Sequence, residues 1–527
     1  MFLGYRFDAV AAKITLIWAL GFVLLVITSF WYCDNHLIYS LDDPYIHLAV
    51  ARNILLGNYG VNVHEASSPS SSVLWPWILT FTEFLGLKSA GPLFLNIPAA
   101  LATVYVTVRL VEKLGLINQK TDPIVSYGLG IILILVTSAL ALPMTGMEHS
   151  WHVLTVVLIL DGLISASHGR SPGWVFLAAL VAAPLLRFEG GALSLSVIVS
   201  IWFLGYRRAA LGAALTLGFV LTVYAFYMVH LGLPIVPSSV LTKSAVVVYA
   251  VENYHLAWAI LYNFSSGIHT ERGLILLVSM IYLLFTAFKQ KDRKNSAYVY
   301  IPLIFSILAH LLMGDNFNWE FRYEVYITAL AFLGIIFSFS SGYKPPEQDK
   351  SLLARQLILL GLGLLLFAGS NVISILVTPQ AARGIYKQQY QMHRFVRDYY
   401  HSAVAVNDIG LVSYGNDNFV LDLWGLGSER VRLLSLFGKF DQEAMAKLVD
   451  DHEVRLIMVY EKWFRQGLPK NWLKIAQLRT GRQITSGGTD VSFFITPKAD
   501  KASVLNMLRE FASSLPKEDK LIIFERS

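Results

Sequence analysis

The chain has 527 residues, of which 55% are hydrophobic and 15% are charged, and its mean hydropathy is +0.54. The charged fraction is well below the roughly 25% of soluble domains, which excludes an ordinary soluble protein. The single cysteine, Cys33, excludes an internal disulfide framework and a cysteine-based metal site. The net charge of +6 comes mostly from basic loops between apolar segments, so it gives no reason to predict nucleic-acid binding.

Long apolar segments recur up to residue 377. A helix needs roughly 20 apolar residues to cross a bilayer. Eleven spans are expected, at 14–32, 91–111, 123–142, 150–166, 173–186, 190–205, 209–230, 272–288, 297–313, 323–340 and 356–377. The segment 73–87 is also apolar, but it is short and contains Pro76 and Glu83. If this segment is an interfacial or re-entrant helix, the basic loops all fall on one side, as the positive-inside rule requires. We therefore expect an α-helical, multi-pass protein of the cytoplasmic (inner) membrane, surrounded by its lipids.

The composition becomes that of a soluble domain after residue 377, which predicts a membrane domain over 1–377 and an α/β domain over 378–527. Helical runs are expected at 380–400, 440–450 and 500–514. β-rich runs are expected at 403–406, 419–423, 455–460, 491–496 and 521–525. An odd number of spans from a cytoplasmic N-terminus makes this domain extracytoplasmic. Its Trp424, Trp463 and Trp472 could stack on sugars, although core packing is the commoner role of such aromatics.

Unusual polar residues gather at the ends of the spans that this topology places outside. They are Asp42, Asp43, His47, Arg52, His64, Glu65, Glu148, His149, Arg187, Glu189, Lys243, His269, Arg272, Asp315, Glu320 and Arg322. Ionisable groups near bilayer depth are expensive and usually face a cavity. A transporter would more often carry such groups near the midplane, at broken helices. The asymmetry predicts an extracytoplasmic active site.

The adjacent carboxylates Asp42 and Asp43 are central to this prediction. Pro44 suits the first turn of a helix, and the helix dipole favours acidic residues there. Asp43 and His47 lie four residues apart, so a helix places them on one face. The plain alternative is a capped surface helix. A lone histidine such as His47 is also more often a hydrogen-bonded structural residue than a ligand.

The other polar motifs each have a structural and a functional interpretation. Thr145-Gly146-Met147-Glu148-His149 is either a tight interhelical turn or a support for its glutamate as a second acid or metal ligand. Arg187-Phe188-Glu189 is either a surface salt bridge or an arginine that holds an anionic substrate. Lys243 belongs either to an ordered loop or to a phosphate site. The segment from Gly314-Asp315 to Arg322 is either a capping turn or an element that reads sugar and phosphate.

Several of these motifs follow one another in a characteristic order. They are Asp42-Asp43, Ala51-Arg52-Asn53-Ile54-Leu55, Ala66-Ser67-Ser68-Pro69, Thr145-Gly146-Met147-Glu148, Arg187-Phe188-Glu189-Gly190, Pro234, and Gly314-Asp315 with Arg322. This order resembles the GT-C class of integral-membrane glycosyltransferases, closest to its arabinofuranosyltransferase-like branch. The resemblance covers roughly residues 10–325. It implies inverting transfer of a sugar from a polyprenyl-phosphate-linked donor to a glycan or glycolipid acceptor, on the outer (periplasmic) face, in cell-envelope assembly.

The chemistry implied by the resemblance assigns roles to the candidate residues. One carboxylate, Asp43 or Asp42, would deprotonate the acceptor hydroxyl as it attacks the anomeric carbon. Positive charge for the departing lipid phosphate would come from Arg187, Lys243 and Arg322. The further candidates for substrate binding are His47, Arg52, Glu148, His149, Glu189 and Asp315. A divalent metal ion is an open question, with Asp43, His47 and Glu148 as ligands if they converge.

Other classes of function make different demands on the sequence. A glycan ligase with a lipid-diphosphate donor should have a more arginine-rich outer loop than 231–270, in which Lys243 is the one lysine or arginine. A lipid or solute transporter should have paired broken helices and midplane charges. A non-catalytic scaffold would have no need of carboxylates and arginines in this order.

Overall fold

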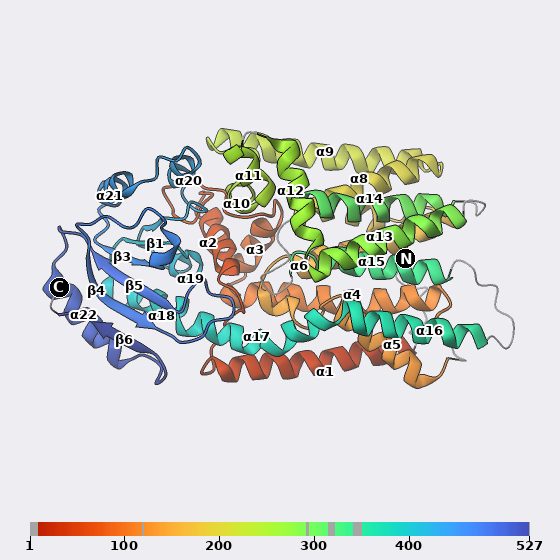
Figure 1. Cartoon of the computed structure of the whole chain (residues 1–527), viewed down its shortest axis with the longest axis horizontal. Coiled ribbons are helices and arrows are strands. Elements are labelled where there is room, and N and C mark those ends of the chain that lie inside the picture. The colour runs from red at the N-terminus through yellow and green to blue at the C-terminus, as the bar shows by residue number, and fades with distance from the viewer. Residues whose placement is uncertain are drawn as a thin grey trace.

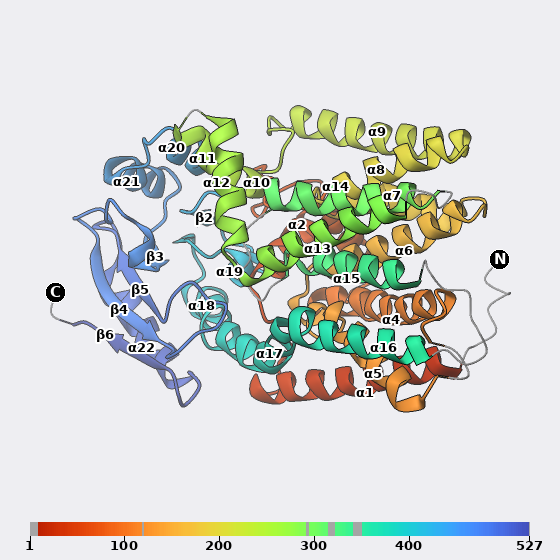
Figure 2. The same ribbon diagram turned by 45° about the vertical axis from the view of Figure 1, so that its right-hand side comes forward.

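The computed structural model describes residues 9–117, 121–253, 255–290, 295–314, 322–340 and 350–525. Long helices lie side by side as a bundle, and a β-sheet domain stands at one end of it (Figure 1, Figure 2). Between bundle and sheet lie four short helices: α2 (Asp43–Leu55), α3 (Trp75–Phe84), α10 (Ser238–Lys243) and α11 (Ala245–Asn253).

The bundle helices follow the apolar segments of the sequence. They are α1 (Ala9–Tyr32), α4 (Gly91–Lys113), α5 (Pro123–Val136), α6 (His149–Ser167), α7 (Trp174–Leu186), α8 (Gly190–Phe203), α9 (Arg207–His230), α13 (Glu271–Lys289), α14 (Ala297–Met313), α15 (Val325–Ser340), α16 (Lys350–Leu362) and α17 (Gly369–Lys387). The helix α12 (Leu256–Ile268) lies instead in the expected outer loop 231–270 and runs across the bundle helices (Figure 1). Among the described helices, five are long and apolar enough to cross a membrane, or six if a bent pair that includes α16 and α17 is one span. Five shorter apolar helices accompany them. The number of eleven spans therefore stays a prediction.

Burial separates the centre of the bundle from its rim. Nearly every side chain of α15 is buried, whereas Leu20 and Leu24 of α1 and Phe219 and Phe226 of α9 are exposed. Helices that are apolar all round are stable only inside a protein or in lipid. The exposed apolar faces of α1 and α9 are those that lipid would cover, as expected for a multi-pass membrane protein.

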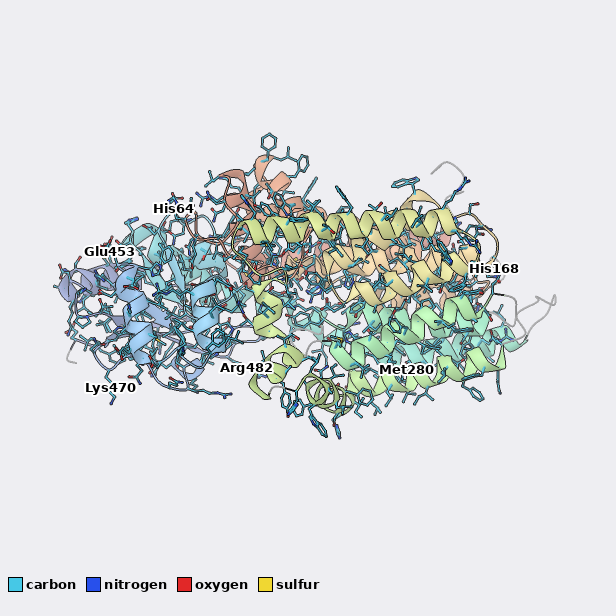
Figure 3. The ribbon with its side chains drawn as sticks, turned by 90° about the horizontal axis from the view of Figure 1, so that it is seen from above. His64, His168, Met280, Glu453, Lys470 and Arg482 are labelled. Carbon is cyan, nitrogen blue, oxygen red and sulfur yellow. The ribbon has the colours of Figure 1, made fainter. Side chains whose placement is uncertain are left out.

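The expected interfacial segment is the helix α3. Its ten residues are too few to cross a bilayer, and it packs against α2 beside the sheet domain. Figure 3 shows how the two ends of the bundle differ: His64, in the loop after α2, lies toward the sheet domain, and His168, just after α6, lies at the opposite end. The loops that follow α2 and α6 thus lie at opposite ends of the molecule.

The C-terminal domain is built on one mixed sheet with the strand order β2-β1-β3-β5-β4-β6. The strands are β1 (Val404–Val406), β2 (Val420–Asp422), β3 (Leu456–Val459), β4 (Leu473–Arg479), β5 (Asp490–Ile495) and β6 (Lys520–Ile523). β1 pairs in parallel with β2 and β3, and the remaining pairs are antiparallel. Five of these strands coincide with the predicted runs, which confirms the α/β domain; β4 was not among them.

Helices cover the sheet and join it to the bundle. They are α18 (Gln389–Phe395), α19 (Gly410–Ser413), α20 (Glu429–Leu436), α21 (Gln442–Asp451) and α22 (Lys501–Ser513), with short helical turns at Val396–Tyr400 and Glu461–Trp463. Three further short turns, at Lys88–Ala90, Leu142–Thr145 and Gly363–Phe367, belong to the bundle. One apolar core contains Ile46 of α2 and Met228 of α9 together with Phe395 and Phe493 of the domain. The predicted boundary at residue 378 falls inside α17, which runs on from the bundle toward the sheet.

Candidate active site

A cavity of about 370 Å³ lies at the end of the bundle that faces the sheet domain. Its walls come from the start of α2, the turn between α7 and α8, the helix α10, the end of α14 and the segment before α15. Of the predicted site residues that the structure describes, five line it: Asp43, His47, Arg187, Glu189 and Lys243. Residues more than 100 positions apart in the sequence are thus gathered around one space.

Asp43 is the first residue of α2, and two cations face its carboxylate. Arg322 Nη2 lies 2.5 Å from Oδ2, and Lys243 Nζ lies 3.5 Å from Oδ1. Burial raises the pKa of Asp43, but Lys243 and Arg322 lower it by more, so the net pKa lies well below its usual range. The low pKa favours the ionised carboxylate. The side chain is 23% exposed and is accessible from the cavity.

A second ionic cluster is centred on Arg187. Its Nη1 lies 2.9 Å from Glu148 Oε1, and its Nη2 lies 2.7 Å from Glu189 Oε1. Burial raises the pKa of Glu189, but Arg187 lowers it more, to about 2. The Arg187-Phe188-Glu189 turn is therefore not a solvated surface salt bridge, since Arg187 is only 5% exposed and Glu148 is fully buried.

Tyr323 joins the two clusters and was missed by sequence reasoning. Its ring centroid lies 5.1 Å from the guanidinium carbon of Arg187 and 4.8 Å from that of Arg322. Its hydroxyl oxygen accepts a hydrogen bond of 2.9 Å from Arg322 Nη2. The ring thus makes a cation–π contact with each arginine and links the two clusters. Its position next to Arg322 was the only signal in the sequence.

Two predicted histidines are buried: His47 lines the cavity, and His149 lies against the ring of Tyr323. The Nδ1 of His47 and the Nε2 of His149 have no hydrogen-bond partner among the described residues. Burial lowers the pKa of His47, although Glu148 and Asp43 oppose that effect. The ring centroids of His149 and Tyr323 lie 5.9 Å apart, with the planes at 77° in an edge-to-face arrangement. Asp315, also predicted, lies outside the described residues.

Asp42 and Arg52 contact the C-terminal domain instead of lining the cavity. The Asp42 carboxylate accepts hydrogen bonds from the backbone N–H groups of Gly410 (2.7 Å) and Leu411 (2.9 Å). Burial and the nearby Asp408 raise the pKa of Asp42 well above its usual value. Arg52 pairs with Asp417 at 2.7 Å. The structure therefore separates the acidic pair: Asp43 faces the cavity, and Asp42 holds the sheet domain in place.

The turn that precedes Glu148 lies close to the start of α2. Gly146 has φ +69°, and a Cβ there would lie 2.7 Å from Pro44 Cβ and 2.9 Å from the Tyr39 ring. Glycine thus lets the turn touch the residue that follows Asp43.

We expect Gly146→Ala to lower the melting temperature more than Gly169→Ala does. Gly169 has φ +85° but nothing within 4 Å of its Cβ position, so its variant carries only the left-handed backbone cost of about 1–2 kcal/mol. Gly146→Ala adds a steric conflict with Pro44 and Tyr39. Thermal unfolding of the purified variants in nanodiscs measures the difference, and equal shifts would show that the turn can move aside.

The described carboxylates of the cavity are not arranged as a site for a divalent cation. In the part of the chain that the structure describes, no three His, Cys, Asp or Glu side chains form a group that could hold a metal ion. Asp43, His47 and Glu148, the predicted ligands, do not converge into one such group. Arg322 and Lys243 already neutralise Asp43, and Arg187 neutralises Glu148.

Solved structures with this architecture include two enzymes. The apo oligosaccharyltransferase of Archaeoglobus fulgidus aligns with a TM-score of 0.51 at 10% identity over 99% of this chain and 76% of that one. Its complex with Zn and sulfate aligns at 0.52 and 10% identity over 96% and 74%. Apo ArnT from Cupriavidus metallidurans aligns at 0.50 and 12% identity over 90% and 97%. At these identities the likeness concerns the fold, which is the predicted GT-C fold.

At the level of sequence, one family of unknown function matches part of the chain. Residues 381–494 match a family described as a domain of unknown function (DUF8728), which covers most of the sheet domain. No curated protein sequence matches the chain. The likeness to the arabinofuranosyltransferase-like branch stays a prediction.

Proposed function

We propose that the protein is an inverting glycosyltransferase that uses a polyprenyl-phosphate-linked sugar, with its cavity on the outer (periplasmic) face of the cytoplasmic membrane. The observation that carries this proposal is the Asp43 carboxylate in the cavity wall, flanked by Arg322 and Lys243. A glycosyl transfer of this kind needs a base for the acceptor and positive charge for the leaving phosphate. Both are present within one small space.

The base we propose is Asp43. As the acceptor oxygen attacks the anomeric carbon and the bond from that carbon to the phosphate oxygen breaks, the hydroxyl proton passes to this carboxylate. Asp42 is not available for the role because its oxygens accept two backbone N–H groups of the sheet domain.

The phosphate site we propose is formed by Arg322 and Lys243. Two nitrogens of Arg322, Nε and Nη1, are buried and have no partner among the described residues. A buried donor without a partner costs about 1–3 kcal/mol, which a phosphate oxygen would recover. A phosphate that binds these cations would share the charge that now holds the pKa of Asp43 down. The carboxylate would then become more basic when donor is present.

The described wall of the cavity is balanced in charge before any substrate binds. Among the residues that line it, Asp43 and Glu189 offset Arg187 and Lys243. Next to them, the buried Glu148 and Arg322 pair with Arg187 and Asp43. A phosphodiester donor brings one further negative charge, whereas a lipid-diphosphate donor brings more. This balance favours a monophosphate donor over the diphosphate of a glycan ligase. Arabinofuranose is the sugar that the family resemblance suggests.

Transfer from a donor panel tests the proposal. We expect purified protein in nanodiscs to cleave at least one polyprenyl-phosphate sugar, with arabinofuranose among those offered, and to release polyprenyl phosphate and an inverted glycoside. The panel also contains a polyprenyl-diphosphate oligosaccharide and a nucleotide sugar. Turnover of only the diphosphate donor would indicate a ligase instead. Lipid movement across the bilayer without bond cleavage would indicate a transporter.

A further inference from the structure

A second cavity, of about 450 Å³, shares the helix α10 with the candidate active site. Ser239 and Lys243 line the first cavity, while Leu241 and Thr242 line the second. Figure 1 and Figure 2 show α10 and α11 next to α20, where the bundle meets the sheet domain. A ligand in the second cavity is therefore one short helix away from Asp43 and Lys243.

Two tryptophans form one wall of this second cavity. The ring centroids of Trp424 and Trp463 lie 4.7 Å apart, with the planes tilted by 56°. Trp424 is 39% exposed, whereas Trp472, the third predicted sugar-stacking residue, is 7% exposed and belongs to an apolar core. Trp424 thus keeps an exposed surface, and Trp463, which packs partly against the apolar core of the domain, is half-buried beside it.

The backbone behind the tryptophans holds them in position. Asp422 accepts hydrogen bonds from the N–H groups of Trp424 (2.8 Å) and Gly427 (2.6 Å). A Cβ at Gly487 would lie 2.1 Å from Trp463 Cζ2, so only glycine lets that ring pack so close to the backbone. The indoles are therefore preorganised, which lowers the entropy lost when a ligand binds.

Polar groups surround the aromatic wall. The hydroxyl of Thr242 is buried and has no hydrogen-bond partner among the described residues. Arg465 and Gln466 are exposed at the rim, and Arg432 donates from Nε to Glu429 Oε2 at 2.8 Å. The cavity thus combines flat apolar surfaces with donors and an unsatisfied hydroxyl, and its volume falls within the roughly 300–1,000 Å³ of ligand sites.

We propose that this second cavity binds the glycan acceptor, an inference that rests on the proposed function. A sugar ring has an apolar C–H face, which suits an indole, and a rim of hydroxyls, which suits Thr242 and Arg465. An oligosaccharide seated against Trp424 would have one end beside α10, whose Lys243 lines the first cavity together with Asp43. The two cavities would then separate donor and acceptor on either side of α10.

Glycan binding without donor tests this inference independently of transfer. The probes are tetrasaccharides of arabinose, mannose, galactose and glucose, with an uncharged tetrapeptide as the alternative ligand, titrated by calorimetry into wild-type protein in nanodiscs. We expect one glycan to bind, and we expect Trp424→Ala and Trp463→Ala each to weaken it about tenfold or more. The matched control is Trp174→Ala, because Trp174 is 69% exposed at the start of α7.

The outcomes separate the two proposals. Glycan binding lost in Trp424→Ala and kept in Trp174→Ala supports the acceptor site even if no donor is turned over. Binding that is unchanged in the Trp424→Ala/Trp463→Ala double variant overturns the site, and so does binding of the peptide alone or of no glycan. If donor is cleaved but the KM for acceptor stays the same in Trp424→Ala, the proposed function stands and the acceptor site is wrong. Should Trp463→Ala fail to fold, Arg465→Ala at the exposed rim replaces it.

Discussion

Asp43→Asn is expected to lower turnover by about 10²–10⁴-fold, the range for loss of a general base. Asparagine keeps the shape of the side chain but cannot accept the acceptor proton. The substitution also removes the negative charge that faces Arg322 and Lys243. These cations are then freer to hold the donor phosphate, so the KM for donor should stay the same or fall. Steady-state transfer assays that vary the donor measure both quantities.

The combination of lost kcat with undiminished donor binding is what distinguishes a base from a structural carboxylate. The matched control is Asp161→Asn, because Asp161 also pairs with a lysine, Lys113, at 2.8 Å, but lies about 18 Å along α6 from its first residue. It should keep wild-type turnover. If Asp43→Asn retained full turnover, another group would have to accept the proton.

The sequence predicted the parts of the site that depend on short-range patterns. The carboxylate before a proline predicted the start of α2, and the glycine at position 146 predicted a tight turn; both are present. The preference of ionisable groups for a cavity predicted that Asp43, Arg187 and Lys243 would lie together, and they line one space. These predictions rest on local geometry and on the cost of charge near a membrane.

The other features of the site and the fold depend on contacts between residues that are distant in the chain. Such contacts cannot be inferred from one sequence. Asp42 and Asp43 look equivalent in the chain, and only the position of Gly410, 368 residues later, separates their roles. Tyr323 has no motif of its own. In the sheet domain, β4 escaped prediction because a register shift between Lys474 and Ala476 interrupts the alternation that marks a strand.

Arg187→Met should destabilise the protein by about 3–5 kcal/mol, the range for removal of one partner of a buried ion pair. The fully buried Glu148 would lose its counter-ion, and Glu189 would lose a hydrogen bond of 2.7 Å. Arg187→Lys should recover only part of the loss, because an ammonium cannot reach both carboxylates and stack on Tyr323 as the planar guanidinium does. Melting temperatures in nanodiscs rank the variants.

A second substitution tests whether the unpaired charge of Glu148 causes the destabilisation in Arg187→Met. Glu148→Gln placed on Arg187→Met removes the buried charge that the first change leaves, so the double variant should melt above Arg187→Met alone. Arg52→Met is the matched control, because its partner Asp417 has an 88% exposed side chain and such surface pairs contribute about 0–1 kcal/mol. If Arg187→Met melted like Arg52→Met, water would have to reach Glu148. The cavity would then be too wet to strengthen the interaction between Arg322 and a phosphate, because that strength depends on a low local dielectric.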